Sequence, residues 1–131
     1  MQNDTAKMLK VALLLCIVMQ LVYGLGLLLI PGPLVTMSGG PKPEYGWLRW
    51  SGGILVGLAY GTYLVFRNPA KQGIYVTMLV LSNLLNAVGH LISIIAGDFT
   101  GATWWIVLPM VVTFALAAFL WWARQQAKAI L

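Results

Sequence analysis

Residues 11–30, VALLLCIVMQLVYGLGLLLI, run for 20 positions without a charged side chain and stop at Pro31-Gly32-Pro33. At about 1.5 Å of rise per residue, a helix of this length spans the roughly 30 Å hydrocarbon core of a bilayer. Water is absent there, so the backbone must satisfy its own hydrogen bonds, and a helix does so. The run is longer than the apolar core of a signal peptide, about 7–15 residues, and no small-x-small cleavage site follows closely. We therefore predict a permanent membrane helix.

The rest of the chain has the same character. It has 131 residues, of which 60% are hydrophobic and 8% charged, with a mean hydropathy of +0.87. A soluble domain is about one quarter charged, so these side chains are too few to solvate a globular surface. Three further apolar runs follow the first. We predict an all-α, polytopic transmembrane four-helix bundle, one domain over residues 1–131, with helices at about 8–30, 47–66, 72–96 and 103–123.

Lysine and arginine side chains lie singly at the ends of the apolar runs. The predicted side that holds both termini has six of them, namely Lys7, Lys10, Arg67, Lys71, Arg124 and Lys128. The other side has Lys42 and Arg49. Cytoplasmic ends of membrane helices carry the excess of such residues, so we predict a multi-pass protein with both termini in the cytoplasm. The connections near 67–71 and 97–102 are short, which makes the helices they join antiparallel.

Residues 82–93, SNLLNAVGHLIS, place polar side chains inside an apolar run. At about 100° per residue these side chains share a wedge of about 120°. They are Ser82, Asn83, Asn86, His90 and Ser93. An amide facing lipid has no hydrogen-bond partner, so we predict that this wedge turns inward as the seam of the bundle. By depth along the helices, we predict a midplane polar layer of Gln20, Asn86 and Thr113.

The run at 47–66 has glycines at intervals of four, Gly53, Gly57 and Gly61. Small residues at this spacing let a neighbouring helix approach closely. We predict that they pack helices inside the bundle, and the alternative is a homodimer interface.

Several kinds of chemistry are excluded by residue counts. The acidic residues are Asp4, Glu44 and Asp98, and none lies deep in an apolar run. A proton-coupled exporter, a two-carboxylate hydrolase and an aspartate-rich prenyl-transfer site all need such carboxylates. Cys16 is the chain's one cysteine and His90 its one histidine, which excludes an intrachain disulfide, a dithiol and a histidine cluster. No basic stripe suggests nucleic acid. We predict a protein without catalytic residues whose partner is the lipid bilayer.

His90 is the main candidate for a functional side chain, since an ionisable residue within a membrane helix is a functional hypothesis by default. It can contact a quinone or serve as the single axial ligand of a tetrapyrrole metal. It can equally tie helices together through Ser51 or Tyr23. Arg49 either reaches the headgroups or lies above His90 over an outward-opening pocket. The candidate ligand-binding residues are His90, Arg49, Tyr23, Ser51, Asn86 and Gln20.

The order of features resembles the small four-helix inner-membrane proteins of bacteria, of the DoxX-like kind. The matching features are the first helix ending at Pro31, LRWSGGILVGLAYG at 48–61, the third helix with Asn86, Gly89 and His90, and WWAR at 121–124. The resemblance implies a location in the bacterial inner membrane and a role as an accessory subunit of a quinone-linked redox enzyme. It carries over no catalytic residue.

These observations lead to one expectation with two alternatives. We expect a non-enzymatic accessory or scaffold subunit, or a protein that binds a small lipophilic ligand, with no cofactor of its own. One alternative is a quinone- or tetrapyrrole-binding component of a membrane redox complex that uses His90. The other is a small-solute transporter. A homodimer or a larger membrane complex is compatible with each of them.

Overall fold

The computed structural model describes residues 2–38, 45–98 and 104–131, and this part of the chain is helical without strands. The helices are α1 (Gln2–Leu29), α2 (Pro31–Ser38), α3 (Tyr45–Arg67), α4 (Gly73–Ala96) and α5 (Trp104–Gln126). The prediction of an all-α protein is therefore confirmed. The long helices follow the four predicted runs, although α1 begins at Gln2 rather than near residue 8.

The short helix α2 was not predicted, because the Pro- and Gly-rich segment after residue 30 was interpreted as a loop. Proline has no amide hydrogen to donate, but the first turn of a helix does not need one. Pro31 thus ends the run of α1 and also begins α2. Lys42, which entered the charge count, lies outside the described residues.

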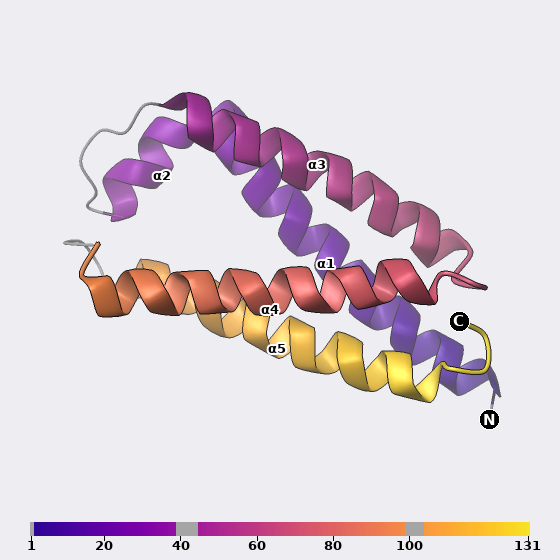
Figure 1. Ribbon diagram of the computed structural model, residues 1–131. Helices are drawn as coiled ribbons and strands as arrows, with labels where there is room; N and C mark the ends of the chain where they lie inside the picture. The colour runs from indigo at the N-terminus through magenta and orange to yellow at the C-terminus, as the bar shows by residue number, and fades with distance from the viewer. Residues whose placement is uncertain (1, 39–44, 99–103) are drawn as a thin grey trace.

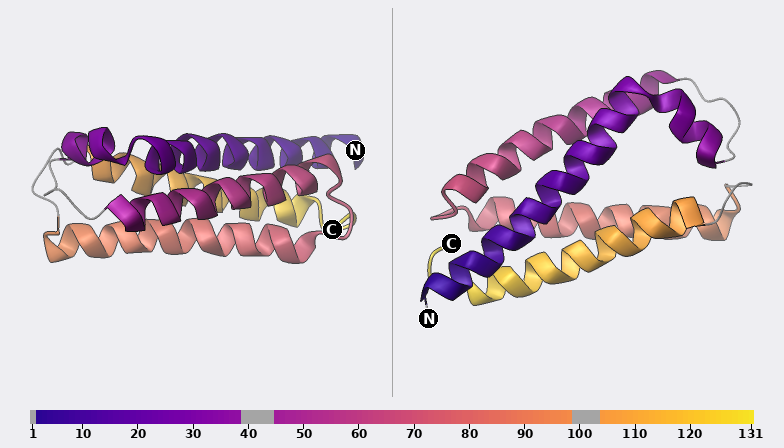
Figure 2. Two further views of the ribbon diagram at one scale, coloured as in Figure 1. Left: turned by 90° about the horizontal axis from the view of Figure 1, so that it is seen from above. Right: turned by 180° about the vertical axis from the view of Figure 1, so that it is seen from behind.

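The long helices form two pairs, α1 with α3 and α4 with α5, and α1 also packs on α5. The pairs meet at the end of the molecule that holds both termini and diverge toward the end that holds α2 (Figure 1). The view from behind shows the same divergence (Figure 2). The molecule is therefore closed at one end and wedge-shaped at the other.

The closed end contains the hydrophobic core. Its largest fully buried apolar side chains are Leu9 and Leu13 of α1, Val76 of α4 and Leu120 of α5. Burying an apolar side chain of this size contributes about 1.5–3 kcal/mol in water. Between helices in lipid the hydrophobic effect is absent, so close van der Waals packing has to hold these helices together.

The pairing of α1 with α3 depends on two glycines. A Cβ added to Gly52 would lie 2.6 Å from the Leu28 nitrogen and 2.7 Å from the Gly24 oxygen. A Cβ added to Gly24 would lie 3.1 Å from the backbone nitrogen of Val56. The two backbones thus approach more closely than any side chain permits, which is typical of glycine contacts between membrane helices.

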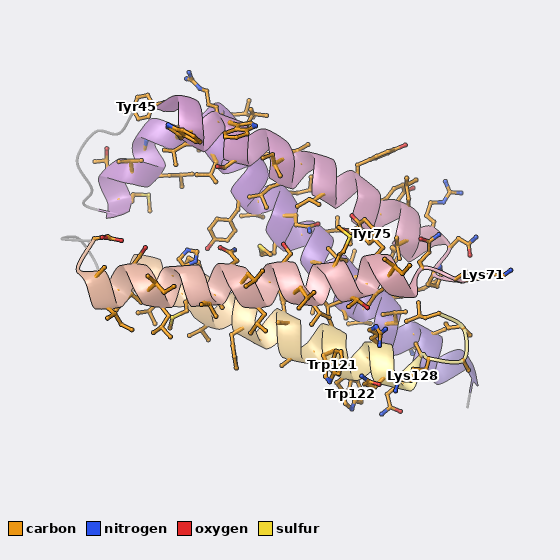
Figure 3. All side chains as sticks on the ribbon, in the orientation of Figure 1. Tyr45, Lys71, Tyr75, Trp121, Trp122 and Lys128 are labelled. Atoms are coloured by element: carbon orange, nitrogen blue, oxygen red, sulfur yellow. The ribbon has the colours of Figure 1, made fainter. Side chains whose placement is uncertain are left out.

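Three segments are long and apolar enough to cross a membrane, namely Ala6–Leu29, Gly73–Ala96 and Val107–Gln126. The large apolar side chains on their outer faces are exposed, as lipid-facing side chains would be (Figure 3). α3 is not among the three, since its glycines, tyrosines and Arg49 lower its hydropathy. The predicted fourth span therefore stays a prediction.

Candidate ligand cavity

A cavity of about 540 Å³ lies where the two helix pairs diverge, and residues of all five helices line it. Most of the lining is apolar, including Leu27 of α1, Leu34 of α2 and Leu58 of α3. The polar side chains that line it are Tyr23, Ser51, Ser82, Asn86, His90 and Thr113. An apolar pocket of about 300–1,000 Å³ with a few polar groups has the usual form of a small-molecule site.

Four of the six predicted ligand-binding residues line this cavity, namely Tyr23, Ser51, Asn86 and His90. They come from α1, α3 and α4, so the fold brings together side chains that are up to 67 positions apart in the sequence. Arg49 is exposed and does not line the cavity. Gln20 is 3% exposed and also lies outside the lining.

The lining also includes residues that the sequence did not single out for ligand binding. Ser82 and Thr113 lie on the inner sides of α4 and α5, and Leu34 comes from α2. The polar wedge of the third run already included Ser82. The long Pro- and Gly-rich connection near 31–46 suggested a cap on the outer face, but the sequence did not indicate that this segment forms a helix that lines a cavity.

The hydrogen bond of His90 fixes which of its ring nitrogens carries the proton. Its Nδ1 lies 2.8 Å from the backbone oxygen of Asn86, one turn earlier in α4. A carbonyl oxygen can only accept, so Nδ1 must donate, and the neutral ring then has its lone pair on Nε2. No described residue bonds Nε2. His90 therefore offers a hydrogen-bond acceptor, or a metal-ligating nitrogen, at the cavity.

The other cavity residues differ in how far the protein already satisfies their side chains. Ser51 Oγ donates to the Trp47 oxygen at 2.9 Å, and Thr113 Oγ1 donates to the Pro109 oxygen at 2.9 Å. The side chains of Tyr23, Ser82 and Asn86 make no hydrogen bond with the described residues. They leave donors and acceptors available to a bound molecule.

A buried polar cluster joins α1, α3 and α4 outside the cavity lining. Thr62 Oγ1 lies 3.0 Å from Gln20 Oε1 and 2.8 Å from the Leu58 oxygen, and Tyr75 OH donates to that same oxygen at 3.1 Å. The single hydroxyl proton of Thr62 serves one acceptor at a time. Turning the Gln20 amide, so that its nitrogen donates to Thr62, satisfies both contacts. Gln20 therefore has a structural bond that occupies it.

Gln20, Asn86 and Thr113 do not form the predicted midplane layer, so this prediction is wrong. Gln20 bonds Thr62, Thr113 bonds its own helix, and Asn86 lines the cavity. The buried amide of α4 is Asn83, 4% exposed, whose Nδ2 donates to the Leu79 oxygen at 2.8 Å and lies 3.9 Å from Cys16 Sγ. Its Oδ1 has no hydrogen-bond partner among the residues that the structure describes. Helical periodicity placed Asn83 and Asn86 on the same face of α4. It is the position of α1 that makes Asn83 buried and leaves Asn86 to line the cavity.

The predicted glycine series also differs in its surroundings. A Cβ on Gly53 or Gly57 would meet nothing within 4 Å, whereas one on Gly61 would meet the hydroxyl of Tyr75. The close contact with α1 is made by Gly52, one position earlier. Gly53 and Gly57 therefore lie on the outer side of α3, and the homodimer alternative stays a prediction.

Among the described residues, no group of three His, Cys, Asp or Glu could hold a metal ion. No protein-family model, curated protein or solved structure matches this chain. The class of the protein therefore comes from its own structure. Three helices able to cross a bilayer make it a small multi-pass integral membrane protein.

Proposed function

We propose that this protein binds a small lipophilic ligand in the cavity between its two helix pairs. The single observation that carries the proposal is the cavity itself, about 540 Å³ in volume, with an apolar lining and polar side chains from four helices. A protein that served only as a scaffold would gain from closing this wedge, since membrane helices associate through packing.

The polar side chains indicate the chemistry of the ligand's head. Nε2 of His90 accepts, Asn86 both donates and accepts, and the hydroxyls of Tyr23 and Ser82 do either. A neutral head that carries an O–H or N–H group fits this set, with an apolar body lying against Leu27 and Leu58. Neither Arg49 nor any other Lys or Arg of the described residues lines the cavity, so within this part of the chain an anionic head has no cationic partner.

The alternative of a redox-linked component is favoured by one observation, the free Nε2 of His90. A hydroquinone donates its O–H to such a nitrogen, whereas a quinone offers only acceptors, which the neutral ring cannot bond there. The same nitrogen can serve as an axial ligand to a tetrapyrrole metal. A role as an accessory subunit, as the DoxX-like resemblance implies, is compatible with either ligand.

We also propose the orientation and location of the protein. The basic residues Lys7, Arg67, Lys71, Arg124 and Lys128 belong to segments that lie at the end with both termini (Figures 1 and 2). The positive-inside rule puts this end in the cytoplasm, with α3 as the fourth span. Together with the resemblance, this supports a bacterial inner-membrane protein with both termini inside.

A matched pair of tyrosines tests the proposed function. Tyr23 lines the cavity, whereas Tyr63 on α3 is 43% exposed and does not line it. The protein is purified in mild detergent, its co-purified lipids are identified by mass spectrometry, and binding of a short-chain hydroquinone and of its quinone is measured by Trp fluorescence.

We expect Tyr23→Phe to weaken hydroquinone binding by about 2- to 10-fold, the effect of losing one hydrogen bond of about 0.5–1.5 kcal/mol. Tyr63→Phe should bind as the wild type does. His90→Ala should reduce the preference for hydroquinone over quinone. Equal binding by the two tyrosine variants would refute the assignment of this cavity as the site.

A further inference from the structure

A second pocket lies at the opposite end of the molecule from the wedge, near the chain termini. It has a volume of about 340 Å³, and its lining comes from the turn before α4, the first residues of α4 and the segment from α5 onward. The residues that line it are Lys71, Gly73, Ile74, Arg124, Lys128 and Leu131. Half of them are cationic.

Among the described residues, the side chains that line this pocket include three cations and no anion, and the backbone oxygen of Leu131 lies among them, 3.3 Å from the position of a Cβ added to Gly73. None of the three makes an ion pair with a carboxylate among the side chains that the structure describes. Lys71 and Lys128 are exposed at this end, where Figure 3 shows Lys71 extending beyond the helices. Three positive charges around one concavity raise the local concentration of anions.

The N-terminal end of α4 lies at the same pocket. α4 begins at Gly73, and its N-cap residue Gln72 makes no side-chain capping bond. The first N–H groups of a helix lack intrahelical partners, and the helix dipole makes this end favourable for an anion. Gly73 and Ile74 present this uncapped end to the pocket that the cations line.

The pocket is held in shape by contacts between its two sides. The Thr77 hydroxyl donates to the Gly73 oxygen at 2.7 Å and accepts from Arg124 Nε at 2.8 Å. The remaining guanidinium N–H groups of Arg124 stay available. On the other side, the backbone N–H of Lys71 donates to the Ile130 oxygen at 3.0 Å, which supports the positive φ of Lys71, 61°. A non-glycine residue keeps such a conformation only where its surroundings hold it.

The aromatic side chains beside the pocket indicate its depth in the membrane. The Arg124 guanidinium lies over the Trp121 ring, 5.7 Å from its centroid, and Trp121 and Trp122, which are labelled in Figure 3, are both about half exposed. Tryptophan is enriched where the hydrocarbon core meets the headgroups. This depth is where a lipid phosphate lies and an apolar chain can continue along exposed Ile74.

We propose that this pocket binds the phosphate headgroup of an anionic phospholipid, with Arg124 as the oriented anchor and Lys71 and Lys128 at the rim. Basic pockets between membrane helices at the cytoplasmic side are suited to such headgroups. The site is separate from the lipophilic cavity and does not depend on the function proposed for it.

The test uses two double variants that remove the same charge from the same end. Lys71→Gln with Lys128→Gln removes two exposed pocket cations. Lys7→Gln with Arg67→Gln removes two exposed cations that do not line the pocket. Retention of phosphatidylglycerol against phosphatidylcholine is measured by native mass spectrometry of the full chain released from mixed micelles.

Each pocket cation should contribute about fivefold, so we expect the pocket variant to lose roughly 25-fold in relative affinity for phosphatidylglycerol. The control variant should stay within about threefold of the wild type, the effect of diffuse, screened charge. Arg124→Lys, which keeps the charge but loses the bond to Thr77, should also weaken retention.

Three results would overturn the proposal. One is an equal loss in both double variants, which would mean that surface charge alone attracts the lipid. The second is a wild type that does not prefer phosphatidylglycerol. The third is displacement of the bound lipid by inorganic phosphate alone in large excess, which would make the pocket a site for a free anion.

Discussion

Replacing Gly52 with alanine should loosen the contact between α1 and α3. The added Cβ would lie 2.6 Å from the Leu28 nitrogen, where ordinary contact begins near 3.4 Å, so the two helices must separate by roughly 0.8 Å. Both atoms that it meets first, this nitrogen and the Gly24 oxygen, belong to the backbone, and no side chain can rotate away. A gap of about 0.5–1 Å forfeits a quarter to a half of each neighbouring dispersion contact.

The expected cost follows from two opposing terms. Overpacking of a well-packed contact costs about 1–3 kcal/mol, while alanine is about 1 kcal/mol better than glycine inside a helix. Because the clash is with backbone atoms, the cost lies toward the upper end of that range, and Gly52→Ala should destabilise the fold by up to about 2 kcal/mol. Gly57→Ala has the better helix propensity of alanine without a clash, because its Cβ would meet nothing within 4 Å. This variant should be neutral or slightly stabilising.

The free energy of unfolding can be measured by titrating the protein in mild detergent micelles with SDS and following far-UV circular dichroism. Gly24→Ala provides an intermediate point, since its Cβ would approach Val56 and Leu55 to 3.1 Å. The order of stability should be Gly57→Ala, then Gly24→Ala, then Gly52→Ala. If Gly52→Ala and Gly57→Ala unfold at the same SDS fraction, the close crossing of α1 and α3 at Gly52 is wrong.

Three other predictions follow from the buried and outward-facing residues. Asn83→Leu should leave the free energy of unfolding unchanged or raise it by about 1 kcal/mol in the same titration, because it removes the buried, unpartnered Oδ1 and loses only the bond to Leu79. Leaving a buried polar group without its partner costs about 2 kcal/mol. A larger loss than this would mean that Oδ1 has a partner. Cys16, which is 0% exposed, should resist maleimide labelling in mild detergent and react after unfolding, and rapid labelling of the folded protein would place it on the surface. Gly57→Leu should leave the fold of the monomer intact. A change in oligomeric state, measured by size-exclusion chromatography with light scattering, would reveal a dimer contact on the outer side of α3. An unchanged oligomeric state would remove the homodimer alternative.

The polar residues of the third run show how far helical periodicity reaches. It placed Asn83, Asn86 and His90 on one face, and the structure has Asn83 buried and the other two lining the cavity. Helical periodicity could not separate Asn83 from Asn86, because it gives only the direction in which a side chain leaves its own helix axis. Which part of that face is covered depends on α1, which packs closely at the closed end and diverges beyond it (Figure 1).

The glycines of α3 show the same limit for spacing. Gly53, Gly57 and Gly61 have the interval of a packing series, but the backbone contact falls on Gly52, next to Gly24. A spacing rule identifies residues that permit close approach. The partner helix determines which of them is used, and the partner's position is not written in the spacing.

The sequence by itself determined the membrane character of this protein and its four long helices, but not the short helix α2. In an apolar run long enough to cross a bilayer, the backbone N–H and C=O groups can satisfy their hydrogen bonds by forming a helix. The composition of each run is enough to predict this, whatever the other runs do. Only the tertiary structure decided that the helices form two diverging pairs, that α2 lines the space between them, and that Lys71, Arg124 and Lys128 surround one pocket. Such features depend on the angle and offset between helices, which arise from contacts among residues far apart in the chain.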